Sequence, residues 1–331
     1  MNFRELTNTE AMVEALKEEM TRDPSIFIIG EDLVAHGGIF GQFIGLPEAF
    51  PGRVIDTPIS ETCIVGAGLG AALTGMRPFV DLHFADFTTC AMDEIVNQVA
   101  KIRYMFGGQA KIPIVIWAPD GAGLSAAAHH SQSLEAWFIH TPGLKVVSPC
   151  FPYDVKGLIK TSIRSDDPII FFMHKKIFSR KGPVPEEEYV IPLGKADIKH
   201  PGTDVTIITY SIMVLHALEV AKEMEKEGIR VEVLDLRTLW PMDWEKIAES
   251  VTKTHRVIIA HEACLTCGFG AEISARIQEE LFDELDAPIF RVGAYRVPIP
   301  FSPPLERFVI PGKESLKKTL YNLFGKEIDS K

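Results

Sequence analysis

Residues 53–75 read RVIDTPISETCIVGAGLGAALTG and join a proline-bearing turn to a helical pattern with very few side chains. From residue 61 onward the stretch is mainly Gly, Ala, Val and Leu, with one carboxylate, Glu61, at its front. Because Gly66, Gly68 and Gly70 have no side chain, another backbone or a flat ligand can approach this helix closely. An acid in the first turn also interacts favourably with the helix dipole, so Glu61 has both a structural and a functional interpretation.

The sequence on both sides of this helix alternates short apolar runs with helical patterns. Continuous apolar runs predict buried strands of a parallel sheet. The predicted strands lie near residues 25–30, 77–84, 112–119, 144–149 and 168–173, and the predicted helices near 61–75, 88–105 and 152–164. This alternation predicts an α/β domain over residues 1–180, with a mostly parallel sheet covered by helices.

A change in composition predicts a second domain. Residues 181–203 are rich in Pro, Gly and charge and have no helical period, which predicts a linker. A second, smaller α/β domain is expected over residues 204–331. Its predicted strands lie near 204–210, 229–236, 256–262 and 288–293, and its predicted helices near 212–227, 243–253 and 270–285. The Pro-rich tail, residues 295–312, is expected to be an extended segment laid on another surface.

Length and charge limit the possible functions. A chain of 331 residues exceeds the usual size of one hydrophobic core, which agrees with two domains. The net charge of −11 argues against nucleic acid or an anionic membrane as a partner. The apolar runs are too short to span a membrane. Residues 1–20 show an amphipathic helical pattern rather than a signal peptide, so we expect a cytoplasmic protein or a mature chain in an organelle matrix.

The five cysteines do not suggest a disulfide framework, because they are few and odd in number. Cys264 and Cys267 have the spacing of half a metal or redox site, but the sequence offers no second pair to complete a zinc site. We therefore expect the thiols of this pair to be buried and inert.

Two further segments carry candidate functional residues. Phe84 and Phe87 follow a predicted strand, where α/β sheets hold ligands, although core packing also explains such aromatics. The adjacent histidines His129 and His130 lie on a Gly/Ala/Ser-rich loop between a strand and a helix. Such a loop suits proton transfer by one imidazole. A metal site is not expected here, because the sequence offers no third ligand.

Several common enzyme motifs are absent. The GAGLGA segment at 66–71 does not complete a G-x-G-x-x-G fingerprint, and its glycines lie inside a helical pattern, which argues against nicotinamide or flavin binding. The sequence has no G-x-S-x-G elbow, no P-loop and no H-E-x-x-H zinc motif.

An ordered set of motifs carries a family resemblance. The motifs are VIDTPISE, FADF, KIRYMFGGQ, HHSQSLEA, PGLKVVSP, DLRTLWPMD and GFGAEI. Over essentially its whole length the chain resembles the beta subunit of the thiamin diphosphate-dependent component of 2-oxo acid dehydrogenase complexes. This transketolase-like family includes the pyruvate, branched-chain 2-oxo acid and acetoin dehydrogenases. The resemblance implies a pyrimidine-binding domain followed by a transketolase C-terminal domain.

The resemblance also implies roles for single residues. Glu61 is expected to hydrogen-bond the aminopyrimidine ring of thiamin diphosphate and to promote loss of the thiazolium proton. Phe87 is expected to pack on the pyrimidine, with Phe84 as its neighbour and Ile59 among the cofactor-binding residues. His130 matches the histidine of the family's Gln-His-Ser-Gln motif and is expected to assist acyl transfer to a lipoyl group. His129 replaces the motif's first Gln, so either imidazole is a candidate.

The resemblance implies a partner as well. Thiamin enzymes of this superfamily hold the diphosphate through Mg²⁺, using Gly-Asp-Gly and a later Asn, and this sequence has no Gly-Asp-Gly. An alpha subunit is therefore expected to hold the diphosphate and most of the Mg²⁺ contacts, within an α2β2 heterotetramer that serves a lipoyl-bearing dihydrolipoamide acyltransferase. Acetoin, pyruvate and branched-chain 2-oxo acids all remain possible substrates. A single-chain transketolase-like enzyme and a non-catalytic scaffold are the alternative interpretations.

Overall fold

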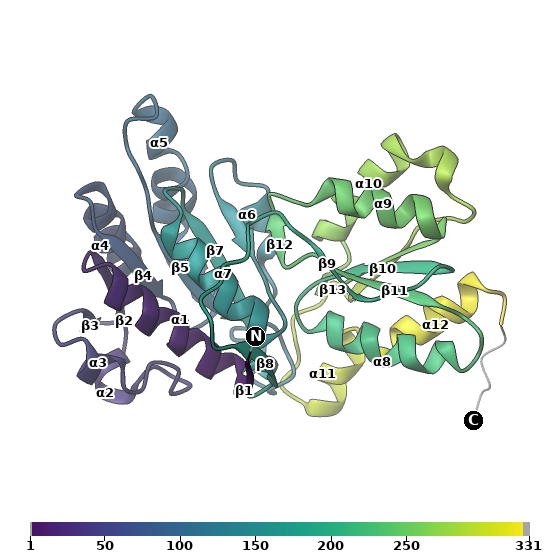
Figure 1. Ribbon diagram of the computed structural model, residues 1–331, viewed down its shortest axis with the longest axis horizontal. Helices are drawn as coiled ribbons and strands as arrows, with labels where there is room; N and C mark the ends of the chain where they lie inside the picture. The colour runs from purple at the N-terminus through teal and green to yellow at the C-terminus, as the bar shows by residue number, and fades with distance from the viewer. Residues whose placement is uncertain (1, 327–331) are drawn as a thin grey trace. The chain divides into compact units, whose positions relative to one another are not determined.

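The computed structural model describes residues 2–326, which divide into two compact units. Among these residues, unit 1 contains those up to 120 together with 137–193 and 239–241. Unit 2 contains residues 121–136, 194–238 and those from 242 onward. Each unit has a mostly parallel sheet with packed helices, so the predicted two-part α/β fold class is confirmed (Figure 1).

The sheet of unit 1 has the strand order β12-β6-β7-β5-β4-β2-β3. Its strands are β2 (Ile26–Gly30), β3 (Val54–Asp56), β4 (Arg77–Asp81), β5 (Val115–Asp120), β6 (Lys145–Val147), β7 (Ile169–His174) and β12 (Thr238–Trp240). Neighbouring strands from β6 to β3 pair in parallel, so their carboxyl ends share one edge. Every residue of β2, β5 and β7 is buried, which explains why these strands are apolar except for Asp120 and His174 at the ends of β5 and β7.

The helical pattern predicted for residues 88–105 is not one helix. It comprises the 3₁₀-helix η1 (Ala85–Ala91), the π-helical turn η2 (Glu94–Val99) and the short α-helix α5 (Ile102–Met105). In η1 the hydroxyls of Thr88 and Thr89 donate to carbonyls three residues earlier, at 2.6 and 2.8 Å. These local bonds support the tight winding, because they satisfy carbonyls that an α-helix would bond otherwise.

The remaining helices of unit 1 vary in length. They are α1 (Asn8–Arg22), α2 (Leu33–His36), α3 (Leu46–Ala49), α4 (Glu61–Leu73), α6 (Glu135–Ile139), α7 (Pro152–Arg164) and the 3₁₀-helix η3 (Lys175–Ile177).

The amphipathic N-terminal pattern is a strand followed by a helix. β1 (Phe3–Thr7) precedes α1, and Thr7 and Glu10 form a capping box that fixes where the helix begins. β1 pairs antiparallel with β8 (Lys181–Pro185) in a two-stranded sheet. The segment predicted as a linker, 181–203, therefore contains ordered structure: β8 and, in unit 2, the strand β9 (Asp197–His200).

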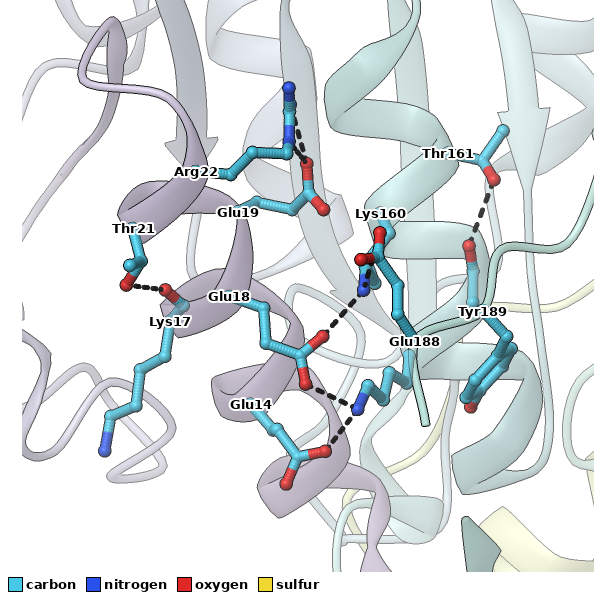
Figure 2. A network of polar contacts seen from close by, with 12 residues as sticks. Glu14, Lys17, Glu18, Glu19, Thr21, Arg22, Lys160, Thr161, Glu188 and Tyr189 are labelled. Atoms are coloured by element: carbon cyan, nitrogen blue, oxygen red, sulfur yellow. Dashed lines mark hydrogen bonds and ion pairs between the residues drawn. The ribbon is translucent and has the colours of Figure 1, made fainter. Parts of the chain in front are cut away.

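α1 and α7 lie side by side and are joined by partly buried ion pairs (Figure 2). The side chains of Lys156 and Lys160 are almost fully buried, and each donates to Glu18 at 2.7 Å. Burial disfavours the charged Glu18 carboxyl, but the two lysine contacts outweigh it and lower its pKa. Arg164 binds Glu19 through Nη2 at 2.6 Å and Nε at 3.0 Å. These ion pairs link α1 to α7 at defined positions along both helices.

The sheet of unit 2 has the strand order β14-β13-β10-β11-β9, and only β9 runs antiparallel to its neighbour. Its other strands are β10 (Val205–Thr209), β11 (Val231–Asp235), β13 (Val257–Cys264) and β14 (Phe290–Ala294). The helices are α8 (Met213–Glu225), α9 (Trp244–Thr254), α10 (Phe269–Glu280), η4 (Phe282–Glu284), α11 (Pro303–Val309) and α12 (Lys313–Leu323). α9 and α10 cover one face of this sheet, and α8 and α12 cover the other (Figure 1).

Two predictions from the sequence are wrong. The tail predicted to be extended, 295–312, contains the helix α11, whose first turn begins with Pro303 and Pro304. Proline fits there because the first helical N–H groups need no intrahelical partner. The expectation that Cys264 and Cys267 are buried is also wrong, since both are exposed. Of the other cysteines only Cys150 is buried, and all five are free.

Candidate active site

Glu61 is the first residue of α4, and its side chain is only partly buried. Its carboxylate forms no hydrogen bond or ion pair with any other residue from 2 to 326, and the N-cap residue, Ser60, makes no side-chain cap. An acid at this position benefits from the helix dipole while both oxygens stay available. Ile59, two residues earlier, is 73% exposed and therefore available for contact with a ligand or partner.

α4 has a packed face and an open face. A Cβ added at Gly68 would lie 2.7 Å from Cγ2 of Val80 and 3.2 Å from Cδ1 of Ile114, so this glycine lets the helix lie close to the sheet. A Cβ added at Gly66 or Gly70 would meet nothing within 4 Å. The small residues predicted to permit close approach therefore serve two surfaces, one against the sheet and one facing outward.

The two predicted aromatics lie together where β4 leads into η1. Phe84 is buried and Phe87 partly buried, with ring centroids 5.5 Å apart in an edge-to-face arrangement. Phe40 meets Phe84 edge-on at 5.7 Å, and the ammonium group of Lys175 lies 5.3 Å from the Phe84 ring centroid. Phe84 is thus held by packing, whereas Phe87 keeps some exposed ring surface.

Sequence reasoning missed a charged cluster at the carboxyl ends of β2 and β4. The backbone of His83 is left-handed, with φ of 58°, and Asp81 fixes it by accepting from its N–H and from Nδ1, each at 3.0 Å. Nε2 of His83 lies 3.9 Å from Glu31. Burial opposes a charged imidazole, but Asp81 and the nearby acids Glu31 and Asp32 outweigh it and raise the pKa of His83.

This cluster sets the direction of the chain as it enters η1, because His83 immediately precedes Phe84. A left-handed histidine is uncommon, and such outliers gather at functional sites. The signal in the sequence was present but local: acids and a histidine directly follow two buried strands, in GED at 30–32 and DLH at 81–83.

The loop with the two predicted histidines belongs to unit 2, although it leaves from β5 in unit 1. His129 is exposed and His130 partly buried, in a turn that the His130 N–H closes on the carbonyl of Ala127 at 3.4 Å. The structure thus groups Glu61, Ile59, Phe84 and Phe87 in unit 1 and the two histidines in unit 2.

Neither a metal cluster nor a membrane span is found in the part of the chain that the structure describes. No three His, Cys, Asp or Glu side chains within residues 2–326 are placed to share a metal ion. Within the same range, no helix combines the length and apolar character needed to cross a bilayer.

Comparison with known proteins defines the class. Residues 4–180 match the transketolase pyrimidine binding domain, and residues 194–316 match the transketolase C-terminal domain. A solved structure of a split gene transketolase, described as an inactive beta4 tetramer, superposes with a TM-score of 0.78 at 25% identity and covers 98% of this chain and 99% of its own.

Curated relatives narrow the class. The beta subunit of acetoin:2,6-dichlorophenolindophenol oxidoreductase from Cupriavidus necator is 48% identical, covering 93% of this chain and 94% of its own length. The 2-oxoisovalerate dehydrogenase beta subunit of Bacillus subtilis is 43% identical, covering 95% and 97%. The pyruvate dehydrogenase E1 beta subunit of Rickettsia felis is 44% identical, covering 96% and 99%. The chain belongs to the transketolase-like family of thiamin diphosphate-dependent dehydrogenase beta subunits, which confirms the predicted family and oxidoreductase class.

Proposed function

We propose that this chain supplies the aminopyrimidine half of a thiamin diphosphate site and that an alpha subunit supplies the diphosphate half. The observation that carries the proposal is the carboxylate of Glu61, which stands partly exposed at the front of α4 with no partner in residues 2–326. A carboxyl group in this state can accept from, or donate to, a heteroaromatic nitrogen. Phe87 offers exposed ring surface on the neighbouring element η1 for a flat ring.

The charges of unit 1 support this division of the site. Acidic side chains follow or end the strands at the carboxyl edge of the sheet, among them Glu31, Asp81 and Glu61. Carboxylates repel a diphosphate, which needs Mg²⁺ or basic groups instead. The same groups can hold and move protons, which an aminopyrimidine requires. The residues present therefore fit the pyrimidine end, and we assign the Mg²⁺-diphosphate contacts mainly to the alpha subunit.

Thiamin diphosphate, when bound, supplies a nucleophilic carbon for attack on the substrate carbonyl. Within this chain, Glu61 would hold a proton at one carboxyl oxygen and exchange it with a pyrimidine nitrogen. Phe87 would orient the ring by packing against it, and Phe84 would support Phe87. His130, or His129 in its place, would donate a proton during transfer of the acyl group to lipoyl-lysine.

The open face of α4 supports the proposed partnership. Cys63, Ala67, Gly70 and Leu73 are exposed on a helix made mainly of apolar residues, a surface suited to burial against another chain. We propose an α2β2 heterotetramer that transfers its acyl product to a lipoyl-bearing dihydrolipoamide acyltransferase. The structurally similar split gene transketolase is described as an inactive beta4 tetramer. We expect assemblies of this chain alone to be inactive too.

Acetoin is the proposed substrate. Its support is the relative at 48% identity, whereas the pyruvate and 2-oxoisovalerate enzymes stand at 44% and 43%. The residues that contact the substrate would lie partly on the alpha subunit, so the small differences in identity make pyruvate a close second candidate. Four exposed free thiols suit a reducing compartment, and we propose a cytoplasmic location on that ground.

Reconstitution tests the proposal. The chain is purified alone and together with a candidate alpha chain that carries Gly-Asp-Gly and a later Asn. Both preparations are assayed with thiamin diphosphate, Mg²⁺ and a lipoyl acceptor against acetoin, pyruvate and 3-methyl-2-oxobutanoate. We expect turnover only from the pair, with acetoin preferred. Full activity of the isolated chain would refute the half-site, and a preference for pyruvate would correct the substrate alone.

A further inference from the structure

The carboxylate of Glu306 is buried in unit 2, and its partners lie on the loop at residues 121–136 that carries the two candidate histidines. Glu306 sits on α11 and is 2% exposed. Its Oε1 accepts from the N–H of Gly123 at 2.7 Å, and its Oε2 accepts from the N–H of Ser125 at 3.1 Å and from the Ser125 hydroxyl at 3.2 Å. No Lys, Arg or His within residues 2–326 pairs with this carboxylate. Two main-chain N–H groups and one hydroxyl, rather than a cationic side chain, therefore compensate a buried charge.

The loop backbone is shaped to present these donors. Gly121, Gly123, Ser125 and Ala127 have φ values of 85°, 93°, 54° and 60°. In this alternation of left-handed residues, the N–H groups of Gly123 and Ser125 point at the same carboxylate, an arrangement like that of an anion-binding nest. Ser125 and Ala127 are strained in this region because they carry a Cβ. The carboxylate of Glu306 occupies this nest as an internal anion and offsets the strain.

Two further carboxylates hold the same loop within unit 2. Glu262, on β13, accepts from the N–H of Ala122 at 2.7 Å. At the other end, the hydroxyl of Tyr210 donates to Glu135 at 2.6 Å. The loop is thus fixed on both sides of His129 and His130 by buried or partly buried hydrogen bonds to acids, and Glu306 makes the largest number of these contacts.

We propose that Glu306 is a positioning residue of the reaction, whose carboxylate fills the nest in the 121–127 backbone and holds the loop in the conformation that presents the catalytic imidazole. The part that concerns catalysis rests on the proposed function of His130, whereas the part that concerns the loop does not. Loss of the carboxylate would leave an anion-binding nest without its anion. A small carboxylate such as formate should then enter and restore the loop.

The test uses the reconstituted heterotetramer with three variants. E306Q keeps the shape of the side chain but replaces an acceptor by a donor, and E306A opens the nest. E314Q is the matched control, because Glu314 is an exposed acid on α12 in the same unit. The measurements are acyl transfer to a lipoyl domain, with kcat and KM determined separately, and hydrogen–deuterium exchange of the amides in residues 121–134, each with and without sodium formate.

We expect E306Q and E306A to lower kcat about tenfold or more with little change in KM, since the charge-assisted hydrogen bonds from Gly123 and Ser125 are weakened or lost. Their 121–134 amides should exchange faster than those of the parent enzyme. Formate should restore E306A in both measurements, while E314Q behaves as the parent. Unchanged exchange in the E306Q and E306A loops would overturn the proposal, as would an activity loss that formate does not repair in E306A.

A double-mutant cycle with H130A separates this proposal from the proposed function. If both are right, E306Q causes little additional loss of acyl transfer in the H130A background. If H130A is fully active, the proposed role of His130 fails. Faster amide exchange and its reversal by formate would still establish that Glu306 holds the loop. If E306A does not assemble with the alpha subunit, E306Q still tests the proposal, because glutamine has nearly the same size as glutamate.

Discussion

The hydroxyl of Thr62 donates a 2.8 Å hydrogen bond to the carbonyl oxygen of Cys90 and thereby joins the first turn of α4 to the end of η1. The two segments joined here carry Glu61 and Phe87, the acid and the aromatic proposed to hold the pyrimidine. We predict that Thr62→Val lowers kcat of the reconstituted enzyme severalfold and lowers the free energy of unfolding by about 1 kcal/mol, because one hydrogen bond is lost. Thr62→Ser should behave as the parent. Equal kcat for Thr62→Val and the parent would show that this bond does not align the site.

Glu61→Gln tests the acid itself. The amide cannot exchange a proton with the pyrimidine, so exchange of the C2 proton of bound thiamin diphosphate should become too slow to detect by NMR. Assembly with the alpha subunit should be unchanged, because the Glu61 carboxylate has no partner within residues 2–326. Normal C2 exchange in this variant would remove Glu61 from the mechanism.

Separate substitutions decide which imidazole acts. For His130→Ala we expect normal exchange of the C2 proton, since Glu61 is intact, but acyl transfer to a lipoyl domain slower by about 10²-fold or more. His129→Ala is the matched control, because His129 is the exposed neighbour on the same turn. The reverse result would reassign the role to His129.

Substitution of Gly68 and of Gly70 in α4 by alanine should change the free energy of unfolding in opposite directions. Gly68→Ala places a methyl group 2.7 Å from Cγ2 of Val80 and should lower the free energy of unfolding by about 1–3 kcal/mol. Gly70→Ala meets open space and should raise it by up to about 1 kcal/mol, because alanine favours the helix. Urea unfolding of the isolated chain measures both. Equal changes in unfolding free energy would contradict the packing of Gly68 against the sheet and the open position of Gly70.

A buried histidine in unit 2 should make stability depend on pH. His261 lies fully buried beneath Gly268 and Gly270, and burial lowers its pKa to about 4, from 6.5. The unfolded chain therefore binds a proton that the folded chain refuses, and this contribution to stability is lost as pH falls from 6.5 to 4, by at most about 3 kcal/mol.

His261→Gln should flatten the decrease in unfolding free energy between pH 6.5 and 4.5, measured in urea. His140→Gln is the control, since His140 is exposed, and it should leave the decrease unchanged. A decrease that is equally steep in His261→Gln would assign the pH dependence to other groups.

Local sequence patterns were sufficient to predict many of the strands and helices of unit 1 and unit 2. The buried strands β2, β5 and β7 were predictable because a strand covered on both faces is apolar along most of its length. The start of α4 and the position of Glu61 followed from one turn and one change in composition. α11 was missed because two prolines suggest an extended chain, although they also fit the first turn of a helix.

By itself, the sequence determined the alternation of strands and helices, the family, and which acid begins α4, since each of these depends on neighbouring residues or on ordered motifs. Only the tertiary structure decided that His83, in a left-handed turn before the aromatic pair, lies near Glu31. It also decided that Glu306 binds the loop of His130, 183 residues from Gly123. Periodicity cannot reveal such contacts, because they arise when the chain folds and bring together polar groups that are distant in sequence.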